Sequence, residues 1–148
     1  MVYLQDSKIQ VQGAEQIAKV FQDLLALEDP IDRAKEHFYV MHLDVKSRIN
    51  LVELVSLGCL TSSIVHPRET FRRAVIQGSA SIIVAHNHPS GEVEPSDEDT
   101  KVTKLLFEAG QVLGIQMLDH IVFTDTKFFS FRSNSTHHIR NTQQKGGE

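Results

Sequence analysis

The feature that most constrains this chain is an apolar run that ends in two histidines one residue apart. Residues 82–85 read I-I-V-A, and His86 and His88 follow directly. A short, near-continuous apolar run is typical of a strand buried on both faces of a sheet. Side chains at positions i and i+2 of an extended segment point to the same side. The pattern therefore predicts a buried strand whose carboxyl end presents two imidazoles to one ion.

A loop and the start of a helix follow the two histidines. Pro89, Gly91 and Pro95 mark the loop. Ser96 and Asp99 then lie three residues apart at the start of a long helical pattern, which resembles a capping box with Asp in place of Glu or Gln. A carboxylate in the first turn also favours the helix dipole. Asp99 can hold this role and still reach an ion.

Two histidines and one aspartate leave a fourth position open for water, which is the pattern of catalytic rather than structural zinc. Asp97 and Glu98 are local alternatives for the carboxylate ligand. Asp99 is favoured because the other two lie on other faces of the helix, but spacing alone leaves the choice open.

Helices and strands alternate along the chain, which predicts an α/β fold with a mixed sheet flanked by helices. The apolar patterns place helices at 14–27, 67–77 and 96–113, and strands at 2–12, 38–44, 49–56, 81–85, 115–124 and 127–131. Residues 1–132 are expected to form one domain. Residues 133–148 are polar and are expected to be a disordered tail.

Composition excludes some classes of function. The net charge of −4 weakens a role in nucleic-acid binding, although a local basic patch stays open. No apolar stretch is long enough for a membrane span, and the N-terminus lacks an apolar signal region, so we expect a cytoplasmic protein. The only cysteine, Cys59, allows no internal disulfide and no thiolate metal site, and we expect it to be buried. The sequence leaves the partner and the oligomeric state open.

The motif around the histidines resembles that of a known family. H-N-H-P-S-G followed by P-S-x-x-D, within residues 86–99, is similar to the JAMM (MPN+) metalloprotease motif. More narrowly, the chain resembles the RadC family over roughly residues 9–131. The further matches are K-E-H-F-Y-V-M-H-L-D at 35–44, V-S-L-G at 55–58, V-H-P-R-E at 65–69 and L-D-H-I at 118–121.

The resemblance implies a JAB/MPN (cytidine-deaminase-like) fold with a Zn²⁺ site. By that match His86, His88 and Asp99 would be the zinc ligands, and Ser96 would hydrogen-bond the bound water or the oxyanion. The function implied is hydrolysis of a peptide or isopeptide bond in an unknown protein or peptide substrate by a metal-activated water.

The JAMM pattern also requires an upstream glutamate as general base. Glu36, where the first long strand begins, and Glu53, in the return strand, are the two candidates. Glu36 is favoured on topology, and the choice stays open. The base would take a proton from the water and pass it to the leaving amine.

Three other functions compete with hydrolysis. A zinc deaminase would need H-x-E and P-C-x-x-C, which a chain with one cysteine cannot supply. A metal-dependent nuclease is disfavoured by the acidic balance. A non-catalytic DNA-repair-associated module of the RadC type is the remaining alternative. The roles of Asp119 and His120, which interrupt an apolar strand, are left open.

Overall fold

The computed structural model describes residues 1–61 and 65–140. Its helices are α1 (Ala14–Ala26), α2 (Pro30–Arg33), α3 (Pro67–Gln77) and α4 (Asp97–Leu113). Its strands are β1 (Val2–Tyr3), β2 (His37–Leu43), β3 (Ile49–Leu57), β4 (Ser81–Asn87), β5 (Gln116–Phe123), β6 (Lys127–Ser130) and β7 (Ser135–His138). These strands form one sheet in the order β1-β3-β2-β4-β5-β6-β7. The mixed sheet with helices confirms the predicted fold class.

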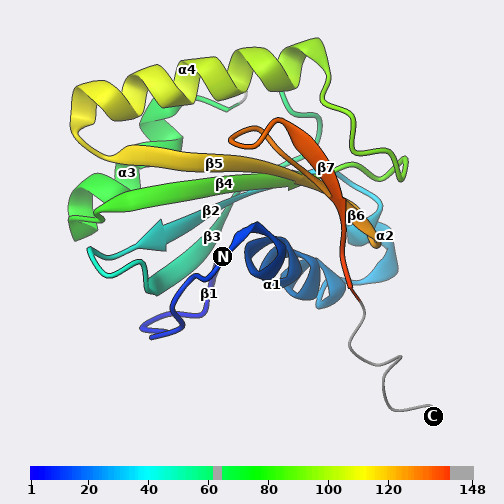
Figure 1. Cartoon of the computed structure of the whole chain (residues 1–148), viewed down its shortest axis with the longest axis horizontal. Helices are drawn as coiled ribbons and strands as arrows, with labels where there is room; N and C mark the ends of the chain where they lie inside the picture. The colour runs from blue at the N-terminus through cyan, green and yellow to red at the C-terminus, as the bar shows by residue number, and fades with distance from the viewer. Residues whose placement is uncertain (62–64, 141–148) are drawn as a thin grey trace.

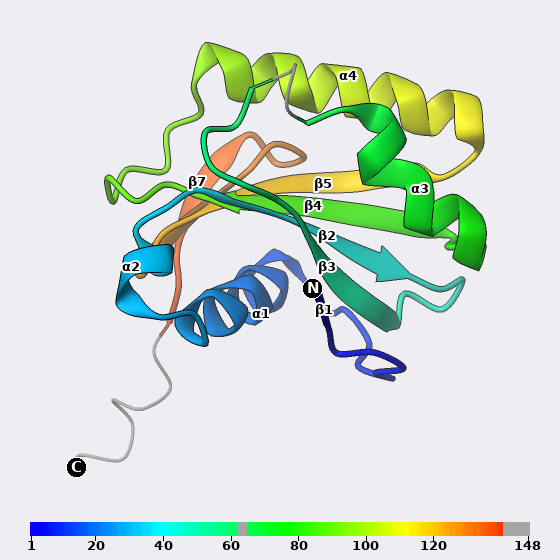
Figure 2. The ribbon, with the colours of Figure 1, turned by 180° about the vertical axis from the view of Figure 1, so that it is seen from behind.

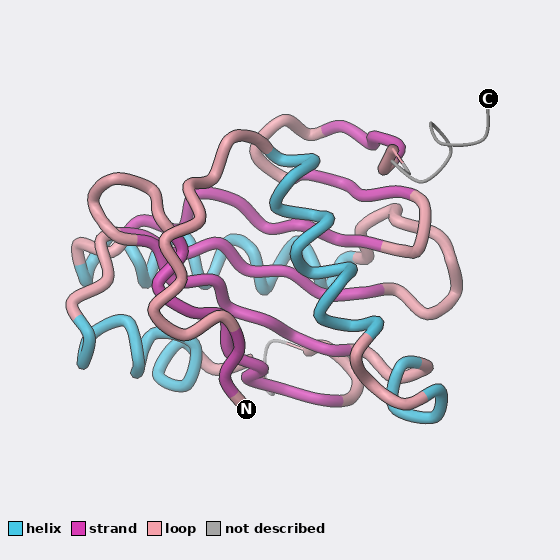
Figure 3. Tube along the Cα trace, turned by 90° about the horizontal axis from the view of Figure 1, so that it is seen from below, coloured by secondary structure: helices cyan, strands magenta, loops and turns pink. Residues whose placement is uncertain are grey.

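The helices cover the sheet on both faces (Figures 1 and 2). The α1 helix lies obliquely across the strands on one face, where it is seen in front of the sheet in Figure 3. It buries the apolar stripe that the sequence predicts, with Ile17, Phe21 and Leu24 packed against Tyr39 and other residues of the sheet. On the opposite face, α3 and α4 lie side by side and form a second core.

Both helices of this second core end at a glycine. Phe71 of α3 packs with Val102 and Leu106 of α4 against the sheet. Gly78 and Gly114 follow α3 and α4 in the left-handed conformation, with φ of 68° and 71°, which glycine adopts without strain.

The pairing of β4 with β5 determines where His86, His88 and Asp99 lie. It is parallel, whereas every other strand pairing described is antiparallel. Parallel neighbours need a long crossover, and α4 supplies it. The crossover begins at the carboxyl end of β4, so the first turn of α4 lies close to that end. As predicted, β4 is buried along nearly all of its length.

The extents of β1 and β4 differ from those expected from the sequence, because each extent depends on which neighbouring strands pair with the segment. The first strand covers only Val2–Tyr3, which pair with β3, rather than residues 2–12. The β4 strand extends to Asn87, two residues beyond the predicted end, because β2 and β5 continue to pair with it there. As a result, His86 is part of the strand.

The sequence predicts a disordered segment after residue 132, and this is wrong for Ser135–His138. These residues form β7, an edge strand that pairs antiparallel with β6. Its S-T-H-H sequence has no apolar alternation, so no local signal predicts a strand. The backbone hydrogen bonds of β6 stabilise it instead. Residues 141–148 lie outside the described residues.

The exposure of Cys59 and the character of the helices are two further features for which the sequence predicts an outcome. Cys59 is exposed rather than buried, because it lies just beyond the end of β3. Among the described residues, no helix has the length and apolar character that crossing a membrane requires.

A substitution in α4 tests the packing of the second core. A methyl group on Gly110 would lie 2.5 Å from the carbonyl oxygen of Ile115 and 3.3 Å from Cζ of Phe71. Glycine to alanine in an exposed helix interior stabilises by roughly 1 kcal/mol. We expect Gly110→Ala instead to lower the free energy of unfolding by about 1–3 kcal/mol, through overpacking. Urea denaturation measures this, with Gln111→Ala on the exposed side as the control. A more stable Gly110→Ala protein would contradict this packing.

Candidate metal centre

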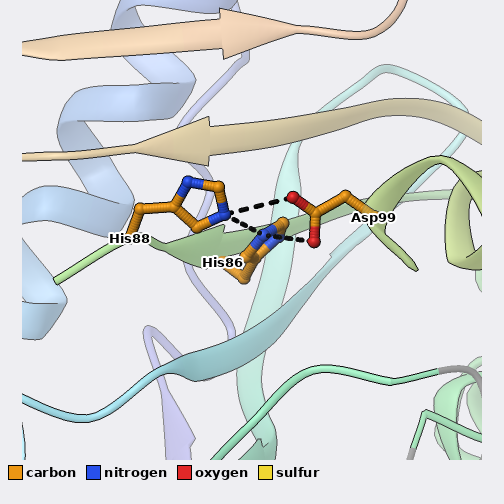
Figure 4. A group of neighbouring side chains, drawn as sticks. All are labelled: His86, His88 and Asp99. Carbon is orange, nitrogen blue, oxygen red and sulfur yellow. Dashed lines mark hydrogen bonds and ion pairs between the residues drawn. The ribbon is translucent and has the colours of Figure 1, made fainter. Parts of the chain in front are cut away.

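Three side chains converge at the carboxyl end of β4 (Figure 4). His86 is the penultimate residue of β4, and His88 follows the strand by one residue. Asp99 comes from the first turn of α4. The extended backbone turns both imidazoles to one side, as the i, i+2 spacing predicts, and the crossover helix adds the carboxylate.

The three side chains present their polar atoms to one another. The two histidine Nε2 atoms are 3.0 Å apart. His86 Nε2 lies 3.1 Å from Asp99 Oδ1, and His88 Nε2 lies 3.1 Å from Asp99 Oδ2. One ligand atom from each residue lies within 4.8 Å of the others, so the group could hold a metal ion. His86 and Asp99 are buried, whereas 14% of the His88 side chain is exposed.

Asp99 performs two roles at the same time. Ser96 Oγ accepts a hydrogen bond from the Asp99 backbone at 3.1 Å, and Asp99 Oδ2 accepts one from the Ser96 backbone at 2.9 Å. This is the predicted capping box. The same carboxylate also faces both histidines. The local alternatives point elsewhere: Asp97 is exposed, and Glu98 pairs with Lys101.

The carboxylate controls the ionisation of its neighbours. Burial raises the pKa of Asp99, but hydrogen bonds from His86 and His88 outweigh burial and hold that pKa far below its usual range. Burial lowers the pKa of His88, but its bonds to Asp99 and to the Glu92 carbonyl outweigh burial, and the net pKa is raised. His86 is more deeply buried, so burial prevails and its pKa is lowered.

Glu36 and Ser96 lie beside this group. Together they line a hollow of about 330 Å³, bounded by Glu36, Cys59, Leu60, His88, Ser90, Glu92, Glu94, Ser96 and Asp99. Glu36 is half-buried just before β2, and its Oε2 accepts a hydrogen bond from the Leu60 backbone at 2.8 Å. That anchor holds the carboxylate on the wall of the hollow.

Glu53, the other candidate base, lies elsewhere. Its Oε2 is 2.8 Å from His42 Nε2 and 3.0 Å from Arg73 Nε. His42 is fully buried and also contacts Ser79. Glu53 therefore belongs to an ion-pair cluster between the sheet and α3. It does not line the hollow.

Asp119 and His120, whose roles the sequence left open, point to different partners. The Asp119 carboxylate accepts hydrogen bonds from Ser130 Oγ at 2.6 Å and from the Arg132 backbone at 3.0 Å, so it holds the end of β6. His120 Nε2 lies 2.8 Å from Nδ1 of His86. Burial, followed by the neighbouring His86, lowers the pKa of His120 well below its ordinary value. The L-D-H-I motif marked this position without indicating its partner.

The chain is similar in sequence to a known family and to proteins of several bacteria. A model of the family described as "RadC-like JAB domain" matches residues 11–136. The chain is 43% identical over 125 residues to a UPF0758 protein of Chlorobaculum parvum, covering 84% of this chain and 54% of that protein. It is 50% identical over 103 residues to a UPF0758 protein of Pelodictyon phaeoclathratiforme, covering 70% and 46% respectively. The chain thus spans about half the length of these relatives.

The coupling between His88 and Asp99 can be measured in metal-free protein. A raised pKa means that this ion pair stabilises the fold fully below the unfolded histidine pKa of about 6.5, and that the contribution is lost as pH rises through the folded pKa. We expect Asp99→Asn, which keeps the cap acceptor, to lower the pKa of His88. An NMR titration of the imidazole measures the shift, with Glu98→Gln as the control. An unchanged His88 pKa in Asp99→Asn would contradict the coupling.

Proposed function

The chain belongs to the family of RadC-like JAB domains, and from this premise we propose that it is a zinc-dependent hydrolase of peptide or isopeptide bonds. One observation carries the proposal. Three side-chain atoms that could ligate a metal ion lie together, and two of their residues, His88 and Asp99, line a hollow that also holds an anchored glutamate. A ligand set with one open position and a nearby base is what metal-assisted hydrolysis requires.

The donor set fits a metal ion. His88 Nδ1 lies 2.8 Å from the Glu92 carbonyl oxygen, which can only accept, so Nδ1 carries a proton. In neutral His88 the Nε2 lone pair then faces the Asp99 carboxylate, also an acceptor. Facing acceptors repel one another unless a proton or a metal cation lies between them, and a metal ion could take the place of the proton. Two imidazole nitrogens and one carboxylate match the ligands of catalytic zinc, which would lower the pKa of a bound water toward neutrality.

Glu36 is proposed as the general base. Its Oε2 accepts from the Leu60 backbone, which leaves Oε1 to receive a proton from a water in the hollow. The same carboxyl would then pass that proton to the leaving amine. Glu36 lines the small hollow together with His88 and Asp99, which supports its closeness to the centre.

Ser96 is proposed to stabilise the oxyanion. Its Oγ already accepts from the Asp99 backbone, so its hydroxyl proton remains to donate. Ser96 lines the same hollow as Glu36. A donor fixed by a helix cap needs little reorganisation when charge develops on the carbonyl oxygen.

The surface around His88 suits a chain-like substrate. His88 also lines a larger groove of about 1160 Å³. Its lining comes from α1, α2 and the loops beside them, and includes Lys19, Gln22, Arg33, Asn87, Pro89 and Thr126. His88 borders both spaces, so a peptide lying in the groove would bring one of its bonds to the centre.

The charges near the centre disfavour the nuclease-like or DNA-repair alternative. Glu36, Glu92 and Glu94 line the small hollow together with Asp99. These carboxylates would repel a phosphate backbone, and the net charge of −4 adds to the effect.

Metal content is the first test. We expect about one zinc per chain in protein purified without an affinity tag, and its loss in His88→Ala, because a site with two protein ligands binds zinc poorly. Elemental analysis measures it. His138→Ala, an exposed histidine in β7, is the matched control and should keep the metal. Wild-type protein without zinc, even after reconstitution, would overturn the proposal.

The assignment of the base is tested separately. We expect Glu36→Gln to keep zinc and the Leu60 contact but to lose roughly 10²–10⁴-fold in turnover, the usual contribution of a general base. Glu53→Gln should keep turnover. The substrates are a pool of peptides from a digested proteome and a lysine peptide carrying a second peptide on its side-chain amine. Mass spectrometry detects the new termini. Full turnover in Glu36→Gln would exclude Glu36 as the base.

A further inference from the structure

We propose that His120 and Thr103 are positioning residues that hold His86 in its metal-binding tautomer, through a chain of hydrogen bonds that begins and ends at Asp99. The proposal rests on the metal site proposed above. It concerns residues that contact neither the hollow nor the larger groove.

The hydrogen-bond chain crosses three elements. His86 Nδ1 in β4 lies 2.8 Å from His120 Nε2 in β5. His120 Nδ1 lies 2.6 Å from Thr103 Oγ1 in α4. Thr103 Oγ1 lies 2.7 Å from the backbone carbonyl oxygen of Asp99, one turn earlier in the same helix. The Asp99 carboxylate faces His86 Nε2 at 3.1 Å, so the chain closes into a ring.

The carbonyl group of Asp99 sets the direction of every bond in the chain. A carbonyl oxygen only accepts, so the Thr103 hydroxyl donates its single proton to it. Thr103 must then accept from His120, which therefore carries its proton on Nδ1. A neutral imidazole has one N–H group, so His120 Nε2 is an acceptor and the proton on this bond belongs to His86 Nδ1.

This direction leaves the Nε2 lone pair of His86 facing the other two ligands. His88 has the same tautomer, protonated at Nδ1, because its Nδ1 donates directly to the Glu92 carbonyl. Both histidines thus present Nε2 lone pairs to the same point. The partner of the second ring nitrogen is what decides which nitrogen of a metal-ligating histidine is free.

The surroundings of His120 keep its ring in place. It is fully buried, and Phe131 stacks on it with ring centroids 4.9 Å apart and an interplanar angle of 19°. Phe38 meets it edge-on, at 6.3 Å and 86°. The Phe131 backbone also donates to the His120 carbonyl at 3.1 Å. Because the His120 ring is packed and fully buried, it can transmit the orientation set by Thr103.

Thr103 allows a matched pair of variants. Thr103→Val keeps the β-branched shape but removes the hydroxyl, whereas Thr103→Ser keeps the hydroxyl. We expect Thr103→Val to bind zinc about 10-fold more weakly, the usual loss when a group that orients a metal ligand is removed. Thr103→Ser should keep the wild-type affinity. Competition with a chromophoric chelator measures both values. Equal affinities in wild type and Thr103→Val would overturn the proposal.

The tautomers can be read directly, without metal or turnover. Long-range ¹H–¹⁵N spectra of metal-free wild-type protein in alkaline buffer should show His86 and His120 protonated at Nδ1. A proton on Nε2 of either residue would overturn the proposal, and this result does not depend on whether Thr103→Val folds. If the tautomers are as expected but wild-type protein binds no zinc, the proposed function fails and the positioning chain stands.

Discussion

Parallel strands cannot be joined by a short turn, and this constraint places the candidate site. The crossover from β4 to β5 is the helix α4, so the carboxyl end of β4 and the first turn of α4 must meet. His86 and His88 come from the first of these ends, and Asp99 comes from the second. The neighbouring strand β5 then brings His120 beside His86. The contacts that Asp99 and His120 make with the two histidines depend on that one parallel pairing.

Burial makes the polar groups at this point depend on one another. His86, Asp99 and His120 are almost completely removed from solvent, so each polar atom must find a partner within the protein. The Asp99 carboxylate accepts a hydrogen bond from the Ser96 backbone at the start of α4, and the same carboxylate faces the histidines. A single side chain therefore couples the stability of α4 to the chemistry of the centre.

Local patterns predicted some elements well and others poorly. The apolar stripe of α1, the capping box of α4 and the buried character of β4 follow from residue types a few positions apart. The last two residues of β4 and the whole of β7 depend instead on neighbouring strands that pair with them. The pairing of a strand is decided by the partner strand, and here the residue types of the paired segments themselves do not indicate it.

The sequence by itself determined which residue types could gather at the centre: two histidines at strand spacing and an aspartate at a helix start. Only the tertiary structure decided between Glu36 and Glu53 as neighbours of that centre, because Glu36 just precedes β2, Glu53 lies on the adjacent β3, and the two differ in what folds against them. Glu36 meets the Leu60 backbone at the hollow, whereas Glu53 meets His42 and Arg73. The same holds for His120 and Thr103, whose contact joins β5 to α4. Spacing along a chain records which side chains share a face of one element, but contacts between elements arise only when packing brings them together.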